Sequence, residues 1–164
     1  MRRVLIFGCG GMLGESVYKR FSKDYEVMAT DIDVNEPWLE YLDVRDLPAV
    51  SKITEKFKPD LIINLAALTD LEYCELNPKE AWSTNALGQE NICSVAKPLN
   101  ATVVYISTAG IFDGKKEFYD DFDIPNPINV YGKSKYHGEV ITPKLIEKHF
   151  IFRAGWMMGG GPPK

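Results

Sequence analysis

The chain has 164 residues, of which 45% are hydrophobic and 26% are charged, and its formal net charge is -4. This length suits one ordinary domain, and the composition is typical of a soluble globular protein with a hydrophobic core. The negative charge gives no reason to expect nucleic acid or an anionic membrane as a partner, and the longest apolar stretch, residues 61–68, is too short to span a bilayer.

The cysteines and histidines of the chain give no sign of a disulfide framework or a metal site. Cys9, Cys74 and Cys93 are an odd number and lack the CxxC spacing of zinc sites. His137 and His149 have no partner at ligand spacing, so no metal is expected. This cysteine usage favours the reducing environment of the cytoplasm.

Short apolar runs alternate with segments of helical periodicity along the chain. We expect strands at residues 3–7, 26–30, 41–44, 61–65, 102–107 and 150–153. Helices are expected at 12–21, 47–57, 78–96 and from 130 onward, with a kink or restart at Pro143 and a loop at 114–129. This alternation predicts an α/β fold, a doubly wound parallel sheet of about six strands or more with helices on both faces.

A glycine-rich turn joins the first expected strand to the first expected helix. Gly8 permits a tight turn, Gly11 lets the backbone approach a pyrophosphate, and Gly14 allows close helix–sheet packing. Met12 and Leu13 complete the turn, and the helix N-terminus supplies N–H donors and the positive end of the helix dipole. The segment therefore predicts a dinucleotide-binding site in a Rossmann-type domain.

Asp31 ends the second expected strand, where a carboxylate can bind the adenosine ribose of such a cofactor. It would accept hydrogen bonds from the ribose hydroxyls and would repel a 2′-phosphate. NAD(H) is therefore favoured as the cofactor. NADP(H) stays open as an alternative, because a neighbouring Arg or Lys side chain can reverse this preference.

Tyr131 and Lys135 are spaced i and i+4 and therefore share one face of the expected helix. An ordinary phenol has a pKa of about 10, and a nearby ammonium would lower it toward neutral pH. Thr108, at the carboxyl end of a strand, can hold a substrate oxygen. We expect Tyr131 to protonate the substrate oxygen, while Lys135 lowers the Tyr131 pKa and holds the nicotinamide ribose.

Together these motifs resemble those of the extended short-chain dehydrogenase/reductases, which act on nucleotide sugars. The resemblance also rests on Asp43-Val44, Asn64-Leu65-Ala66-Ala67 and Asn85. Residues 107–114, 126–132, 138–139 and 153–156 narrow it to the dTDP-4-dehydrorhamnose reductases, and it runs along essentially the whole chain. By this resemblance the chain is expected to be an NAD(P)-dependent reductase of a nucleotide-activated keto-sugar.

The resemblance also implies roles for further residues. Asp43 and Val44 would flank the adenine, and Asn85 would steady the helix beneath the site. Trp156 would contact the substrate. The cofactor path would be lined by Leu65, Ala66 and Ala67. Ordinary backbone hydrogen bonding explains Asn64 and Asn85 equally well, and an anchored core aromatic is the alternative for Trp156.

Ala109 and Gly110 depart from the reductase pattern, which usually has an acidic residue and an aromatic here. They argue against the related sugar-nucleotide dehydratases, and Ala109 keeps an NAD-dependent nucleotide-sugar epimerase open. Phe112-Asp113-Gly114 favours the reductase. A non-catalytic, cofactor-binding regulatory subunit is a third hypothesis, which the motif residues Tyr131, Lys135 and Thr108 oppose.

Proteins of this kind continue into a C-terminal portion that binds the nucleotide sugar. Residues 1–164 are therefore expected to form the NAD(P)-binding domain, with that portion absent from this chain. The expected partner is a small-molecule nucleotide sugar, and a homodimer is compatible with the resemblance.

Overall fold

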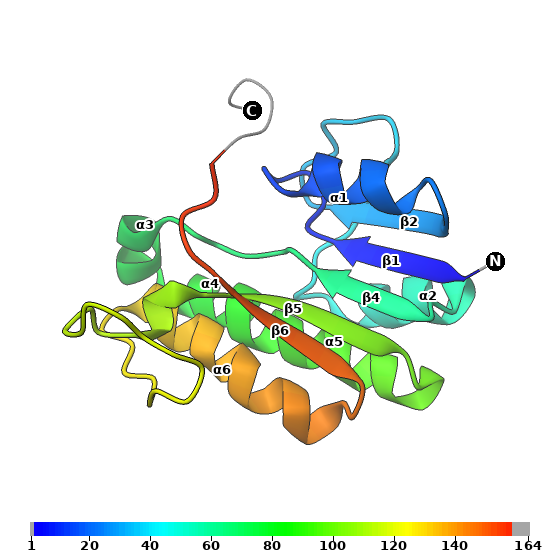
Figure 1. Cartoon of the computed structure of the whole chain (residues 1–164). Coiled ribbons are helices and arrows are strands. Elements are labelled where there is room, and N and C mark those ends of the chain that lie inside the picture. Colours follow the sequence, from blue (N-terminus) through cyan, green and yellow to red (C-terminus); the bar gives the residue numbers. More distant parts are fainter. Residues whose placement is uncertain (1, 159–164) are drawn as a thin grey trace.

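A computed structural model describes residues 2–158 and shows one parallel sheet with helices on both faces (Figure 1). The strand order is β3-β2-β1-β4-β5-β6, and each neighbouring pair is parallel. The strands are β1 Arg3–Phe7, β2 Glu26–Asp31, β3 Leu39–Tyr41, β4 Leu61–Asn64, β5 Thr102–Thr108 and β6 His149–Ala154. This is the strand order of the Rossmann fold, so the predicted doubly wound α/β architecture is confirmed.

The helices divide between the two faces of the sheet. They are α1 Gly14–Phe21, α2 Leu47–Phe57, α3 Leu71–Leu76, α4 Pro78–Trp82, α5 Gly88–Ala96 and α6 Val130–Leu145, with a π-helical turn at Ser83–Leu87 and short 3₁₀ turns at Lys97–Leu99 and Ala109–Ile111. On one face, α1 packs on β1, β2 and β4 through Val17, Tyr18 and Phe21. On the other face lie α2, α5 and α6 (Figure 1).

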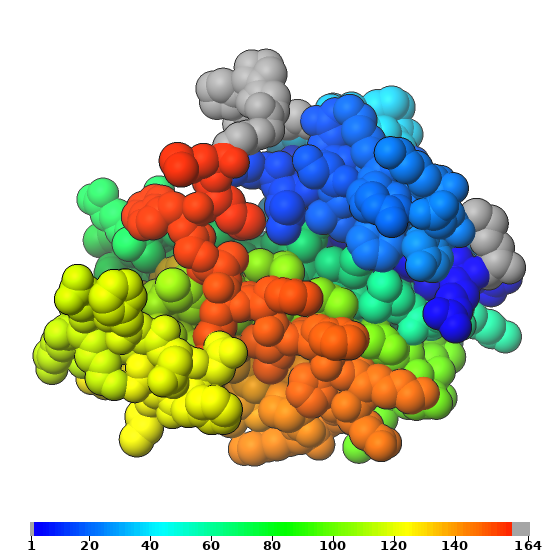
Figure 2. Space-filling model, viewed as in Figure 1, coloured from blue at the N-terminus to red at the C-terminus, as the bar shows by residue number. Residues whose placement is uncertain are grey.

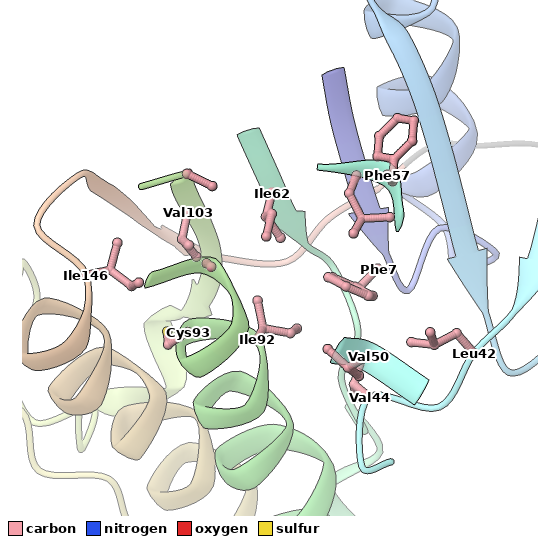
Figure 3. Packing of buried hydrophobic residues seen from close by; sticks show 13 residues of the cluster. Phe7, Leu42, Val44, Val50, Phe57, Ile62, Ile92, Cys93, Val103 and Ile146 are labelled. Carbon is pink, nitrogen blue, oxygen red and sulfur yellow. The ribbon is translucent and has the colours of Figure 1, made fainter. Parts of the chain in front are cut away.

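The larger core cluster lies between the sheet and the second set of helices (Figure 3). Every residue of β1 from Val4 to Phe7 is fully buried, because a central parallel strand is covered on both faces. Leu5 and Phe7 point into this cluster, whereas Val4 and Ile6 point toward α1. The strand period of two therefore splits one apolar run between the two halves of the core.

Side-chain caps fix where the helices beside the site begin. Asp46 caps α2 by accepting a hydrogen bond from the Ala49 N–H at 3.0 Å. Asn129 caps α6 in the same way, accepting from the Gly132 N–H at 2.7 Å. Because this cap starts α6 at Val130, Tyr131 lies in the first helical turn.

Apart from shifts of one or two residues at element ends, the structure differs from the expected elements in four places. The strand predicted at 41–44 is wrong, because β3 is Leu39–Tyr41. Leu42 and Val44 lie in the loop that follows β3, and their side chains are buried in the core. The helix α3 was not predicted. The helix expected at 78–96 contains a π-helical turn, and the helix expected to kink or restart at Pro143 continues through it to Leu145.

Within residues 2–158, no helix has the length and apolar character needed to cross a membrane. No cluster of three or more His, Cys, Asp or Glu side chains in this range could hold a metal ion.

Candidate functional site

Two adjoining cavities lie over the carboxyl ends of the strands. The first has a volume of about 580 Å³ and the second of about 470 Å³. Their shared walls consist of Gly8, Gly11, Met12, Leu65 and Ala67, which follow β1 and β4. In the order β3-β2-β1-β4-β5-β6 the chain direction across the sheet reverses between β1 and β4. Open α/β sheets bind ligands at such a switch point, so both cavities occupy the expected place.

The three motif glycines of the loop after β1 have different structural needs. Gly8 has φ 73°, and a Cβ there would lie 2.2 Å from the Ala66 nitrogen. A Cβ at Gly14 would lie 1.8 Å from the Cys9 carbonyl oxygen. Both positions therefore require glycine for folding. Gly11 does not, because an added Cβ would have only the Gly8 oxygen nearby, at 3.8 Å. Gly11 instead leaves open space toward both cavities.

Asp31 connects the glycine loop to the segment that follows β2. Its Oδ2 accepts a hydrogen bond from the Gly10 N–H at 2.8 Å, and its Oδ1 accepts one from the Asp33 N–H at 2.9 Å. The side chain also lines the first cavity. An ionised carboxylate has about four lone-pair sites, so Asp31 keeps acceptor capacity for a ligand hydroxyl.

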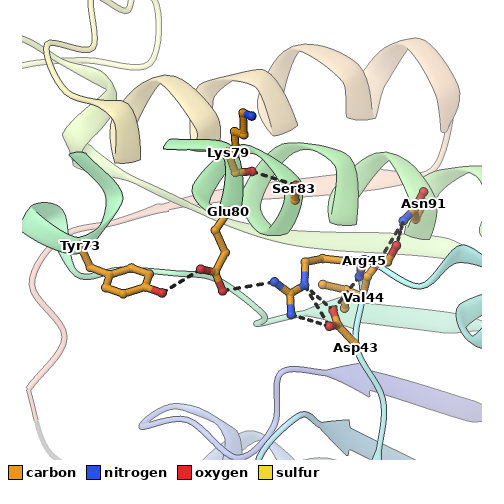
Figure 4. A network of polar contacts seen from close by, with 8 residues as sticks. All are labelled: Asp43, Val44, Arg45, Tyr73, Lys79, Glu80, Ser83 and Asn91. Carbon is orange, nitrogen blue, oxygen red and sulfur yellow. Dashed lines mark hydrogen bonds and ion pairs between the residues drawn. The ribbon is translucent and has the colours of Figure 1, made fainter. Parts of the chain in front are cut away.

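A network of ion pairs crosses the far end of the first cavity (Figure 4). The Arg45 guanidinium binds both carboxylate oxygens of Asp43, with its closest contact at 2.6 Å, and reaches Glu80 on α4 at 3.2 Å. Tyr73 donates a hydrogen bond to the other Glu80 oxygen at 2.7 Å. Hydrogen bonds from Arg45 hold the pKa of the Asp43 carboxyl below its usual value.

Tyr131 and Thr108 face each other in the second cavity. Thr108 ends β5, and its Oγ1 accepts a hydrogen bond from the Gly110 N–H at 3.0 Å. Burial raises the pKa of the Tyr131 phenol, and its hydrogen bond with Thr108 partly opposes that rise. The expected lowering of the Tyr131 pKa by Lys135 is not found, because Lys135 is not among the groups acting on this phenol. At neutral pH the Tyr131 hydroxyl is protonated and can donate a proton.

Lys135 is buried beneath the site and lines neither cavity. The residue is 2% exposed, and its Nζ lies 4.2 Å from the centre of the Tyr105 ring. Burial lowers the Lys135 pKa to about 7, against the opposing effect of the Glu139 carboxylate. A bond from Lys135 to a ligand in the second cavity would therefore require its side chain to change rotamer.

Asn85 joins the wall of the first cavity to the helix that carries Tyr131. Its side-chain amide accepts from the Leu68 N–H at 2.8 Å and donates to the Leu68 carbonyl at 2.9 Å. The same amide donates to the Ser134 hydroxyl at 3.1 Å, and that hydroxyl donates to the Tyr131 carbonyl at 2.8 Å. Asn85 is 1% exposed and lies in the π-helical turn, a feature that often occurs at functional sites.

Asn64 has a comparable local role at the end of β4. Its side-chain oxygen accepts from the Ala66 N–H at 3.0 Å, and its nitrogen donates to Gln89 at 2.7 Å. This buried amide therefore shapes the turn that carries Leu65 and Ala66 into the cavity walls.

The structure brings most residues predicted for the site into the walls of these cavities. The first cavity holds Asp31, Asp43, Val44 and Ala66, the second holds Leu13, Gly14, Thr108, Tyr131 and Trp156, and the shared wall holds Gly8, Gly11, Met12, Leu65 and Ala67. Trp156 is 94% exposed, so it is not a core aromatic. Figure 2 shows its segment, in red, beside the blue glycine loop.

The motifs did not identify several other lining residues of the first cavity. These are Glu15, Ile32, Asp33, Asn35, Arg45, Leu68, Glu80 and Thr84, besides Gly10 and Leu42. Most of them lie just after β2, β3 or β4. Since ligands in parallel sheets bind beside the carboxyl ends of strands, these segments could have been selected from the predicted strand ends alone.

Comparison with known proteins agrees with this architecture. The model of the RmlD substrate binding domain family matches residues 1–163. The chain is 38% identical to dTDP-4-dehydrorhamnose reductase of Aggregatibacter actinomycetemcomitans over 97% of its length and 53% of that protein. It is 37% identical to methionine adenosyltransferase 2 subunit beta of Xenopus laevis over 96% of its length and 48% of that protein.

A solved structure shows the same fold. The crystal structure of dTDP-4-dehydrorhamnose reductase from Bacillus anthracis in complex with NADP superposes with a TM-score of 0.87 at 34% identity, covering 95% of this chain and 54% of that one. The chain thus spans about half the length of the relatives it matches. With a family model matched along nearly all of its length, the chain belongs to the RmlD substrate binding domain family.

Proposed function

We propose that this chain is the NAD(P)-binding portion of a reductase that acts on a nucleotide-linked keto-sugar, as the name of its 38% identical bacterial relative implies. The observation that carries the proposal is the shared glycine wall between two cavities with different linings. One cavity is lined by Asp31, Asp43 and Val44, and the other by Thr108 and Tyr131. A dinucleotide has two unlike halves joined by a pyrophosphate, and this arrangement suits such a ligand.

The adenosine half would lie in the first cavity. Asp31 would accept hydrogen bonds from the ribose hydroxyls, and Asp43 and Val44 would flank the adenine. The pyrophosphate would lie over the glycine loop, where the N-terminus of α1 favours an anion. We propose NAD(H) as the preferred cofactor, because carboxylates line the first cavity at the end of β2, where folds of this type repel a 2′-phosphate.

The nicotinamide half would lie in the second cavity and, in its reduced form, would supply hydride to the keto carbon of the sugar. Tyr131 would give its phenolic proton to the oxygen of that carbon, and Thr108 would hold the same oxygen by a hydrogen bond. Lys135 would bind the nicotinamide ribose after a change of rotamer from its position against Tyr105. Trp156, exposed at the cavity mouth, would contact the sugar.

Gly11→Val separates cofactor binding from folding and tests this proposal. An added side chain at Gly11 meets little of the protein but fills the space between the two cavities. NADH titration followed by fluorescence should show at least about tenfold weaker binding, while the melting temperature stays close to that of the parent. Unchanged NADH affinity in a folded Gly11→Val protein would rule out the glycine wall as the pyrophosphate site.

Tyr131→Phe tests the chemical role. In the full-length protein this change should remove most keto-sugar reduction, measured as NADH consumption, and should leave NADH affinity nearly intact. Lys135→Ala should reduce both. A tyrosine variant that loses cofactor binding instead would point to a structural role. Bound NAD that is regenerated in each turnover, without net consumption during sugar interconversion, would favour the epimerase.

A cofactor-binding regulatory subunit is the second candidate. The observation in its favour is the 37% identity to a protein named as subunit beta of methionine adenosyltransferase, together with a Lys135 side chain outside the cavity. Tight NADH binding with no consumption on any nucleotide-linked keto-hexose, and a stoichiometric enzyme partner, would favour it. For either function we propose the reducing cytoplasm as the location, since all three cysteines are free and buried.

A further inference from the structure

The segment after β2 encloses Gly10 of the glycine loop on both sides. The Gly10 N–H donates to Asp31, and the Gly10 carbonyl accepts from the Asn35 amide at 3.5 Å. A Cβ on Gly10 would lie 3.0 Å both from the Asp31 carboxyl carbon and from the Asp33 carbonyl oxygen. Residues 31–35 therefore form a fixed wall against the loop at this end of the first cavity.

The two carboxylates of this wall have different surroundings. Both oxygens of Asp31 accept backbone hydrogen bonds, which spread its negative charge into the glycine loop and the turn. Asp33 lines the same cavity and is an exposed residue, and within residues 2–158 no group donates a hydrogen bond to its carboxylate. Of these two side chains, Asp33 is therefore the one whose negative charge is less compensated by the protein.

Arg45 is the single basic side chain among the described residues that line the first cavity. It is held between Asp43 and Glu80 (Figure 4), at 2.6 Å and 3.2 Å respectively. To bind a phosphate, its guanidinium would have to give up these ion pairs. No other cation in the described wall would compensate a phosphate placed beside Asp33.

We propose that Asp33 is the residue that excludes a 2′-phosphorylated cofactor, whereas Asp31 mainly holds the glycine loop and the ribose. This inference rests on the proposed function, because it assumes that the adenosine half occupies the first cavity. A 2′-phosphate is attached at the ribose hydroxyl that Asp31 would bind, so it would enter the wall formed by residues 31–35. There the uncompensated Asp33 carboxylate repels a dianion, a repulsive element that confers specificity.

The test measures dissociation constants for NADH and NADPH by fluorescence titration of the chain and three variants. Asp33→Asn removes the proposed repulsion, Asp31→Asn weakens the loop contact, and Asp24→Asn removes the same charge on the surface, outside both cavities. The parent should favour NADH. Asp33→Asn should reduce that preference by about tenfold, chiefly through tighter NADPH binding, and Asp24→Asn should leave it unchanged.

Two further readouts support or overturn the assignment. Asp31→Asn should weaken the binding of both cofactors and lower the melting temperature, because the amide has one acceptor oxygen and so either the Gly10 or the Asp33 N–H loses its acceptor. The NADH preference of the parent should shrink as salt rises to about 1 M, since an exposed charge is screened. An unchanged preference in Asp33→Asn, or its loss in Asp31→Asn alone, would overturn the assignment while cofactor binding stands. Failure of the parent to bind either cofactor would overturn the proposed function and the assignment with it.

Discussion

Replacing Lys135 with methionine removes the ammonium group that is buried beneath the second cavity. In the folded chain this group contacts the Tyr105 ring and is 2% exposed, and its pKa falls from 10.5 to about 7. The cause is desolvation, which the Glu139 carboxylate offsets only in part. Methionine has a similar length and a flexible apolar side chain, so it can occupy the same space without a charge.

The direction in which stability changes with pH follows from the number of protons that the folded and unfolded chains bind. Between about pH 7 and pH 10.5 the unfolded chain keeps a protonated lysine that the folded chain has lost, so stability rises with pH across this window. Below this window both states are protonated and the full cost of burying the charge remains. A shift from 10.5 to about 7 corresponds to a cost of roughly 5 kcal/mol, of which roughly 2 kcal/mol is relieved between about pH 7 and pH 9.

Urea unfolding of the parent and of Lys135→Met over this pH range measures the effect. The variant should be the more stable protein at about pH 7, and its advantage should shrink by roughly 2 kcal/mol by about pH 9. The buried thiols of Cys9 and Cys93, whose pKa values are raised to about 12 and about 11, titrate in both proteins and cancel in the difference. A stability difference that does not change with pH would show that solvent reaches the Lys135 ammonium, contrary to the burial described above.

Two other substitutions test the framework of the site. Gly14→Ala places a methyl group 1.8 Å from the Cys9 carbonyl oxygen, so it should cost at least about 3 kcal/mol of stability in thermal unfolding; a loss below about 1 kcal/mol would refute the close contact. Asn85→Ala removes the partner of the Leu68 N–H and leaves the Leu68 carbonyl with only the weak Cys74 thiol donor, so it should cost about 2–4 kcal/mol and weaken NADH binding. Full NADH affinity in a destabilised Asn85→Ala protein would show that Asn85 supports folding alone.

Much of the fold can be predicted from the sequence, because its local signals are strong. The range predicted for β1 agrees with the structure, since a short, continuous apolar run that ends at Gly8 is typical of a strand covered on both faces. The range predicted for α2 also agrees, because Asp46 caps it and Pro48 suits its first turn.

Elements held mainly by tertiary contacts were harder to predict. Leu42 and Val44 alternate with polar residues as in a strand, but they lie in a loop and are buried in the core. The strand that pairs with β2 is β3, which ends at Tyr41. The six-residue helix α3 has too few apolar positions to show a helical period. Its one local signal is Asp70, which accepts a hydrogen bond from the Tyr73 N–H as an N-cap.

Some features of the candidate site can likewise be predicted from the sequence, and others cannot. Positions that depend on backbone geometry, such as Gly8 and Thr108, follow from the order of strands and helices, and both line the second cavity. The direction of the Lys135 side chain does not follow from its i+4 spacing to Tyr131. A buried lysine can turn toward an aromatic ring or toward the cavity, and the Lys135 ammonium lies against the Tyr105 ring. Partners distant in sequence, such as Arg45 and Glu80, were likewise not predictable from motifs.

A crystal structure of the chain with NADH would test most directly whether the two cavities form one dinucleotide site. We expect the adenosine beside Asp31, Asp43 and Val44, the pyrophosphate over Gly11, and the nicotinamide against Thr108 and Tyr131. Density for the cofactor elsewhere on the chain, or a nicotinamide turned away from Tyr131, would contradict the arrangement on which the proposed reaction depends.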